Sequence, residues 1–290
     1  MNAMRFRIAD IVFASDNKLT SSNYLEGSYD EFISYDEPEI GVYGHYNGLP
    51  EISIREEDRV FDSSTFWSFY RIQSQYVLVL RTPSPDQSPY CIALFRERFR
   101  IADIHYNIPE LTTTSDGILP HPMAFPIFHI TMISVLAQGY GVLVHACGVA
   151  DGGRGYLFPA SSTHGKTTMA RLWEKKGTIL NDERVVLRRN KGRLWIYGTP
   201  WHGEYDKVSP KGVPLDKIFF LNKAKANRAC RQTELVSTSG FLAHCFLPFW
   251  DTDGMRFTLD FCAEVVSGIP SFMLDFRPTE DIVDFIRCVK

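Results

Sequence analysis

The sequence lacks the features that mark secreted, zinc-binding or disulfide-rich proteins. Its six cysteines are widely spaced, without a Cys-x-x-Cys pair or clustered histidines, which argues against a zinc site and a disulfide framework. Free thiols in a reducing compartment are expected instead, and we predict a cytoplasmic protein. A signal peptide is not expected, because the first apolar run is short and contains Asp10.

Long apolar runs and an excess of one charge are also missing. The most apolar stretch, residues 125–150, is interrupted by proline, histidine, glutamine and glycine, so we expect a buried helix followed by a buried strand and no membrane span. The formal net charge of −3, from 31 basic and 34 acidic residues, leaves no overall field to attract nucleic acid or an anionic membrane. Partners must therefore be recognised at local sites.

The sequence does contain enough apolar residues for a folded protein, and its two halves predict different secondary structure. The chain has 290 residues, 44% of them hydrophobic, which suffices for one large core or two modest ones. Residues 1–115 hold short segments rich in β-branched and aromatic residues, such as RFRIADIVFA, EISIREE and YCIALFRERFRIADIHY. They predict a mostly antiparallel β-rich N-terminal domain. Prolines, threonines and a glycine in 108–122 place the domain boundary there.

Residues 116–290 predict an α/β domain, in which strands alternate with helices. Strands are expected at 141–150 and 155–160 with a turn at 151–154, a helix at 165–177, and a strand at 178–182. A hairpin at 184–198 should turn at 190–192, and further strands are expected at 216–222 and 270–276.

A phosphate-binding loop is indicated at residues 158–173, FPASSTHGKTTMARLW. The pattern Ala160-x-x-x-x-Gly165-Lys166-Thr167 has alanine where glycine is commoner. In such loops backbone N–H groups face the β-phosphate, the lysine reaches the β and γ oxygens, and the hydroxyl binds Mg²⁺. Such a pattern also arises by chance, and Thr163 and His164 are bulkier than glycine. The predicted strand before the loop and helix after it favour nucleotide binding, with ATP and Mg²⁺ as ligands.

Two acids and a histidine near the loop are candidate chemical groups. Asp182 and Glu183 end the strand after the predicted helix, where a carboxylate can reach a metal ion or the γ-phosphate, although adjacent acids at a strand end are often a solvated turn. His145 lies in the predicted strand 141–150, which precedes the strand that leads into the loop, and alone it would be read as a packed core residue. His202 either lines the mouth of the site or caps a turn.

A basic cluster lies further along the chain, at Lys223, Lys225, Arg228 and Arg231. The usual interpretation is a solvated helix face. The alternative is contact with the triphosphate or with an acidic acceptor.

Taken together, residues 143–187, LVHACGVADGGRGYLFPASSTHGKTTMARLWEKKGTILNDERVVL, resemble the kinase domain of HPr kinase/phosphorylase and its broader relatives. That family has a histidine-containing strand, a strand-loop-helix with the phosphate loop, and an acidic pair after it. The resemblance continues more loosely through GTPWHGE at 198–204 and the segment 265–286, so it covers roughly 140–290. It implies an α/β P-loop kinase fold of the type shared with phosphoenolpyruvate carboxykinases.

Carried over by position, the resemblance implies functions for individual residues. The phosphate contacts extend from Ala160 through Ser161, Ser162, Thr163, His164, Gly165, Lys166 and Thr167 to Thr168. The implied metal ligands are Thr167 and Asp182, and the implied catalytic residues are Asp182, Glu183, His145 and Lys166. The sequence departs from the family at Ala160 and Thr163, where glycines are usual, and at Glu183, where a second aspartate is usual. The distinctive C-terminal segment of the strict HPr enzyme is not found, so a strict HPr kinase is not expected.

The function predicted from these features is an ATP-dependent kinase acting on a hydroxyl, Ser or Thr of a protein or modified peptide. Two alternatives stay open: a nucleotide-binding scaffold or sensor without transfer, and a small-molecule kinase. The expected partner is a protein or peptide substrate, with no nucleic acid and no membrane, and a homo-oligomer is left open. Replacing Asp182 by asparagine should lower transfer by about 10²-fold. If the site is open to water, the same change should alter stability by about 0.5 kcal/mol or less.

Overall fold

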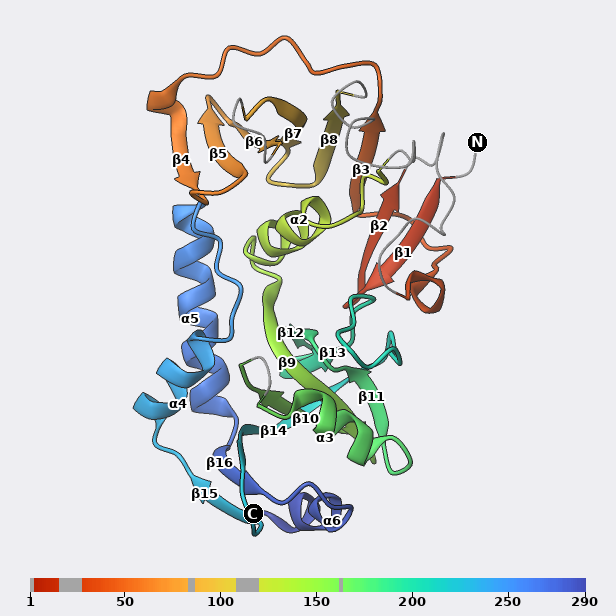
Figure 1. Ribbon diagram of the computed structural model, residues 1–290, viewed down its shortest axis with the longest axis vertical. Helices are drawn as coiled ribbons and strands as arrows, with labels where there is room; N and C mark the ends of the chain where they lie inside the picture. The colour runs from red at the N-terminus through yellow and green to blue at the C-terminus, as the bar shows by residue number, and fades with distance from the viewer. Residues whose placement is uncertain (1–2, 16–27, 83–86, 108–119, 162–163) are drawn as a thin grey trace.

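The computed structural model describes residues 3–15, 28–82, 87–107, 120–161 and 164–290, in which the strands form two eight-stranded sheets (Figure 1). The first sheet has the strand order β1-β2-β3-β8-β7-β6-β5-β4. Its strands are β1 Met4–Ile8, β2 Ile11–Ser15, β3 Ile40–His45, β4 Arg59–Asp62, β5 Trp67–Ile72, β6 Gln75–Arg81, β7 Pro89–Arg96 and β8 Ile101–Tyr106. Neighbours are antiparallel except for β2–β3 and β3–β8, which are parallel. The sheet is therefore mixed, although most of its pairings are of the predicted antiparallel kind.

Local sequence explains most of these strands and one failure. The segment RFRIADIVFA divides into β1 and β2 because Ala9 and Asp10 take positive φ angles of 51° and 58° at the turn. The segment EISIREE forms no strand, so that prediction is wrong. Its isoleucines, Ile52 and Ile54, pack against a small hydrophobic cluster on the sheet. The alternating pattern therefore reflects burial of one side of the segment, without pairing to another strand. A short 3-10 helix, Glu56–Asp58, follows, and another lies at Tyr29–Phe32.

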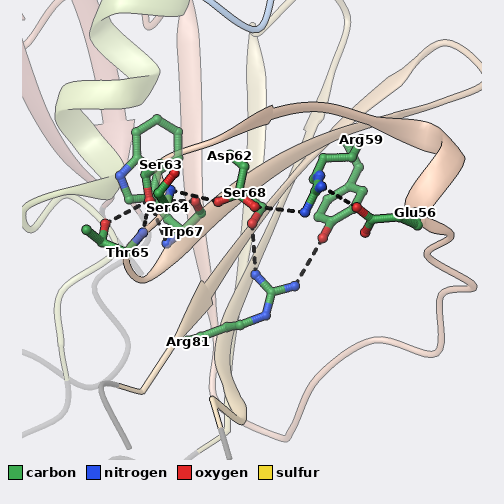
Figure 2. Close-up of polar contacts among 10 residues, drawn as sticks. Glu56, Arg59, Asp62, Ser63, Ser64, Thr65, Trp67, Ser68 and Arg81 are labelled. Atoms are coloured by element: carbon green, nitrogen blue, oxygen red, sulfur yellow. Dashed lines mark hydrogen bonds and ion pairs between the residues drawn. The ribbon is translucent and has the colours of Figure 1, made fainter. Parts of the chain in front are cut away.

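The β4 edge of the first sheet carries charged and hydroxyl side chains that contact one another (Figure 2). Arg59 lies between Glu56 and Asp62 and is 2.7 Å from Asp62 Oδ2. On the neighbouring strands, Arg81 donates to the hydroxyls of Ser68 and Tyr70 at 3.0 and 3.1 Å. A short edge strand covered by charge resists pairing with another chain.

The second sheet contains a closed ring of strands. Its strands are β9 Gly141–Asp151, β10 Arg154–Pro159, β11 Thr178–Asn181, β12 Arg184–Asn190, β13 Arg193–Tyr197, β14 Gly212–Lys223, β15 Arg228–Arg231 and β16 Ser271–Phe276. The pairings β9–β12, β12–β13, β13–β14, β14–β10 and β10–β9 close the ring. β16 and β15 extend it beyond β14, and β11 pairs with β9. The basic segment 228–231 is thus the edge strand β15 rather than the predicted helix.

Helices cover both faces of the part of this sheet that holds the phosphate-loop pattern. The helices are α3 Lys166–Trp173, α4 Glu234–Leu242, α5 Thr252–Gly268 and α6 Asp281–Cys288. Along β14, Phe219 and Leu221 pack with α3 and α6, whereas Ile218 and Phe220 pack with α4 and α5. This alternation is expected of a strand buried on both faces. The carboxyl ends of β10, β14 and β16, which are parallel to one another, therefore lie at one edge.

Helix α2, Ile127–Leu136, joins the two halves of the chain. Figure 1 shows it between the first sheet and β9, and every one of its residues is buried. The core around it takes Phe13 and Phe69 from the first sheet and Leu143 and Val186 from the second. The prediction of a buried helix and a buried strand within 125–150 is confirmed. In the described ranges, no helix combines the length and apolarity needed to cross a membrane.

The turns at 151–154 and 190–192 connect β9–β10 and β12–β13 as predicted. Strand is more abundant than helix, and the parallel pairing typical of α/β folds is limited in the second sheet to β10–β14 and β14–β16, so the P-loop kinase fold stays a prediction. The predicted boundary between 115 and 116 lies outside the described residues.

Candidate functional site

The phosphate-loop pattern lies between the carboxyl end of β10 and the start of α3. β10 ends at Pro159, and Gly165 immediately precedes the helix with a φ of 108°. A Cβ atom at Gly165 would lie 2.8 Å from the Phe276 ring, so both the backbone conformation and the space require glycine. Ser162 and Thr163 lie outside the described residues. The chain therefore has the strand-loop-helix context that the pattern requires.

Lys166 lies with its ammonium group folded against the loop. Its Nζ donates to the carbonyl oxygens of Ala160 at 3.0 Å and Ser161 at 3.4 Å, and it lies 3.9 Å from Glu183 Oε2. The residue is only 5% exposed, and this burial lowers the pKa of its ammonium, an effect that the Glu183 carboxylate opposes. The cation is thus placed beside both the loop and the acidic pair.

Asp182 is a buried carboxylate bound by three donors. Thr167 Oγ1 donates to its Oδ2 at 3.1 Å, the Gly203 N–H to Oδ1 at 2.7 Å, and the Tyr205 N–H to Oδ2 at 3.2 Å. Asp182 is 1% exposed. The alternative of a solvated turn is therefore wrong at Asp182, because the segment around Gly203 covers the carboxylate. The expectation of a small stability change depended on an open site and does not apply.

Glu183 turns toward the neighbouring strand β9. Its Oε1 lies 3.1 Å from His145 Nε2, and both side chains are partly exposed. The hydrogen bond from His145 is the main cause that lowers the pKa of Glu183, and the Lys166 ammonium adds to it. Glu183 is therefore held ionised at neutral pH. The reading of His145 as a packed core residue is wrong, because its ring meets a carboxylate at the site.

The segment carrying Gly203 is held in place by Asn181 and by the N-terminal half of the chain. Asn181 Nδ2 donates to the carbonyl oxygens of Thr199 at 2.9 Å and Trp201 at 3.0 Å. Trp201 Nε1 donates to the Tyr29 hydroxyl at 2.7 Å. The first half of the chain thus helps to position the backbone donors of Asp182, a function that sequence reasoning did not assign to it.

Lys166, Thr167 and Glu183 border a cavity of about 520 Å³, whereas the buried Asp182 lies behind its wall. Its lining comprises Gly165, Lys166, Thr167, Thr168, Glu183, Gly203, Glu204 and Lys223. Lys223 was predicted only as the alternative reading of the basic cluster, and Gly203 and Glu204 were missed. The GTPWHGE segment contains both, but its candidate residue was His202, whose Nδ1 lies 3.0 Å from the Gly203 carbonyl oxygen and which does not line this cavity.

Thr167 and Asp182 fit the protein's share of a Mg²⁺ site. The two oxygens lie 3.1 Å apart, Thr167 lines the cavity, and a hydroxyl with a carboxylate is a donor set that Mg²⁺ takes in nucleotide sites. Over the described part of the chain, no group of three His, Cys, Asp or Glu side chains is arranged to hold a metal. Mg²⁺ at such sites takes most of its ligands from water and phosphate, so two protein oxygens suffice.

Comparison with known proteins finds no matching family model and no matching curated protein.

Proposed function

We propose that the chain binds Mg²⁺-ATP at the 520 Å³ cavity and transfers its γ-phosphoryl group to a hydroxyl of a protein or peptide. The observation that carries the proposal is the convergence of Lys166, Thr167, Asp182 and Glu183 beside the loop at the start of α3. A helix start, a lysine and a hydroxyl-carboxylate pair are the parts that phosphoryl transfer uses. The resemblance of residues 143–187 to the HPr kinase family supports the same reading.

Within this proposal each side chain has one task. Lys166 exchanges the loop carbonyls for the β and γ oxygens of ATP and neutralises their charge. Thr167 and Asp182 would hold Mg²⁺, which, when bound, supplies further positive charge against those oxygens. Glu183, kept ionised by His145, accepts the hydroxyl proton as the acceptor oxygen bonds to the γ-phosphorus, and ADP leaves with the electron pair of the broken P–O bond.

A cytoplasmic location is part of the proposal. All six cysteines are free thiols, Cys91 and Cys147 among the buried ones, and this is the state expected in a reducing compartment.

The test compares Lys166→Ala with Arg171→Ala, which removes an exposed cation from the same helix. Calorimetric titration with Mg²⁺-ATP should give a dissociation constant about 10- to 100-fold higher for Lys166→Ala, because charge-assisted hydrogen bonds to phosphate are lost. Arg171→Ala should bind as the wild type does. Equal affinity of all three proteins would overturn the proposal.

Glu183→Gln separates transfer from binding. It should keep Mg²⁺-ATP affinity within a few-fold and lower phosphoryl transfer from labelled ATP by about 10²-fold. Binding without transfer to any protein, peptide or small hydroxyl compound would support the scaffold or sensor instead. Transfer to small hydroxyl compounds alone would identify a small-molecule kinase.

A further inference from the structure

A second cavity, of about 250 Å³, lies against the same loop but has a different character. Its walls include Phe220 and Leu221 of β14, Val236 of α4 and Met273 of β16. None of the described residues that line it is Asp, Glu, Lys or Arg, whereas the 520 Å³ cavity contains both lysines and glutamates. It therefore suits an uncharged group about the size of one side chain.

His244 gives this apolar cavity a directed polar group. Its Nδ1 lies 2.7 Å from the Gly240 carbonyl oxygen, which can only accept a hydrogen bond, so Nδ1 carries the proton. Nε2 of the neutral ring is then left as a hydrogen-bond acceptor. Burial lowers the pKa of His244 and outweighs the hydrogen bond to Gly240, which raises it; His145, Lys166 and His164 also lower it, so the ring is neutral at neutral pH.

Backbone pairing places His244 at the end of the site where transfer would occur. The His145 N–H donates to the His244 carbonyl oxygen at 2.8 Å, and the adjoining residues Val144 and Cys245 form an antiparallel β-bridge. His145 in turn contacts Glu183, which lies 3.9 Å from Lys166 Nζ. The cavity also shares Ala160 and Ser161 with the loop carbonyls that bind Lys166. It thus adjoins the γ-phosphate end of the proposed site.

We propose that this cavity is the acceptor subsite, that it takes an apolar side chain next to the acceptor hydroxyl of a peptide, and that His244 Nε2 accepts a hydrogen bond from that peptide. His244 is in this view a positioning residue for the acceptor. The inference rests on the proposed kinase function and adds the class of substrate, a serine or threonine with apolar neighbours.

The first test fills the cavity from its open side. Val236→Trp should raise the KM for the probe peptide acetyl-Leu-Ser-Leu-amide about tenfold at saturating Mg²⁺-ATP, while the dissociation constant of Mg²⁺-ATP stays within about twofold. Leu235→Trp is the matched control, because Leu235 is 82% exposed on the same helix and does not line the cavity. The wild type should prefer this peptide to acetyl-Asp-Ser-Asp-amide.

The second test separates the two ring nitrogens of His244. Asparagine can keep the hydrogen bond of Nδ1 to Gly240 and removes the acceptor at Nε2, whereas glutamine can place its oxygen near Nε2. His244→Asn should raise the peptide KM about tenfold with kcat within about threefold, and His244→Gln should restore most of the loss. Equal KM values for these two variants, at either level, would contradict the assignment of Nε2.

Other outcomes also decide the proposal. Weaker Mg²⁺-ATP binding by Val236→Trp with an unchanged peptide KM would assign the cavity to the nucleobase and overturn the inference. Failure of the wild type to prefer the apolar peptide, or an equal effect of Leu235→Trp, would also overturn it. In those cases Mg²⁺-ATP affinity, its dependence on Lys166 and phosphoryl transfer remain, whereas failure of the proposed function itself would appear as a wild type that does not bind Mg²⁺-ATP or that binds it without any transfer.

Discussion

Replacing Asp182 by asparagine should destabilise the fold as well as impair the site. The carboxylate is buried and accepts hydrogen bonds from the Thr167 hydroxyl and from the N–H groups of Gly203 and Tyr205. Asparagine has almost the same volume but only one acceptor oxygen. Whichever way the amide is oriented, its NH₂ group faces at least one backbone N–H, which is left without an acceptor.

The expected cost follows from this mismatch. An unsatisfied buried donor costs about 1–3 kcal/mol, and a hydrogen bond to a charged group contributes about 1.5–3 kcal/mol. Because the two terms overlap, Asp182→Asn should lower the free energy of unfolding by about 2–4 kcal/mol. Asp206→Asn makes the same chemical change on a nearby exposed carboxylate and should stay within about 0.5 kcal/mol.

Equilibrium urea unfolding, followed by circular dichroism and by tryptophan fluorescence, measures both variants against the wild type. Coincident curves from the two probes justify comparing free energies between proteins. If Asp182→Asn changed stability no more than Asp206→Asn, the carboxylate would not be buried under Gly203 and Tyr205, and the arrangement of the site would be wrong.

Two further predictions concern pH and the loop. Burial lowers the pKa of His121 to about 4 and of His129 to about 3, so both fold neutral, and their contribution is complete above the unfolded value of 6.5 and is lost as the pH falls below it. Between pH 7 and pH 5 unfolding titrations should show a loss of about 2 kcal/mol for each of the two histidines, and His129→Leu should halve their combined loss; an unchanged pH dependence would mean that His129 is not buried in neutral form. Gly192→Ala should lower the free energy of unfolding by about 1–2 kcal/mol, because its φ is positive and its surroundings are open. Gly165→Ala should lower it by more in thermal or urea unfolding, because its added Cβ would also clash with Phe276. Equal losses would show that Phe276 does not pack against the loop.

The parts of the site that are contiguous in sequence could be predicted from the sequence. Apolar periodicity marks β10 and α3, and Gly165 marks the end of the loop between them. The Asp182–Glu183 pair follows so soon after α3 that a short connection can place it only near the loop. Turns at 151–154 and 190–192 were likewise marked by glycine, which adopts positive φ there. The failure at EISIREE shows the limit of such patterns, since alternation reports burial of one face and does not report whether a partner strand is present.

Contacts across long stretches of chain were decided only by the tertiary structure. Gly203 and Tyr205 reach Asp182 because Asn181 and Tyr29 hold the intervening segment, and neither contact leaves a local pattern. His244 lies beside His145, 99 positions earlier, because residues 244–246 pair with β9. The sequence by itself determined which segments carry the phosphate-loop pattern and the acidic pair. Closure of the ring through β10–β14 decided which side chains meet there, because strand pairing between distant segments depends on the packing of the whole core.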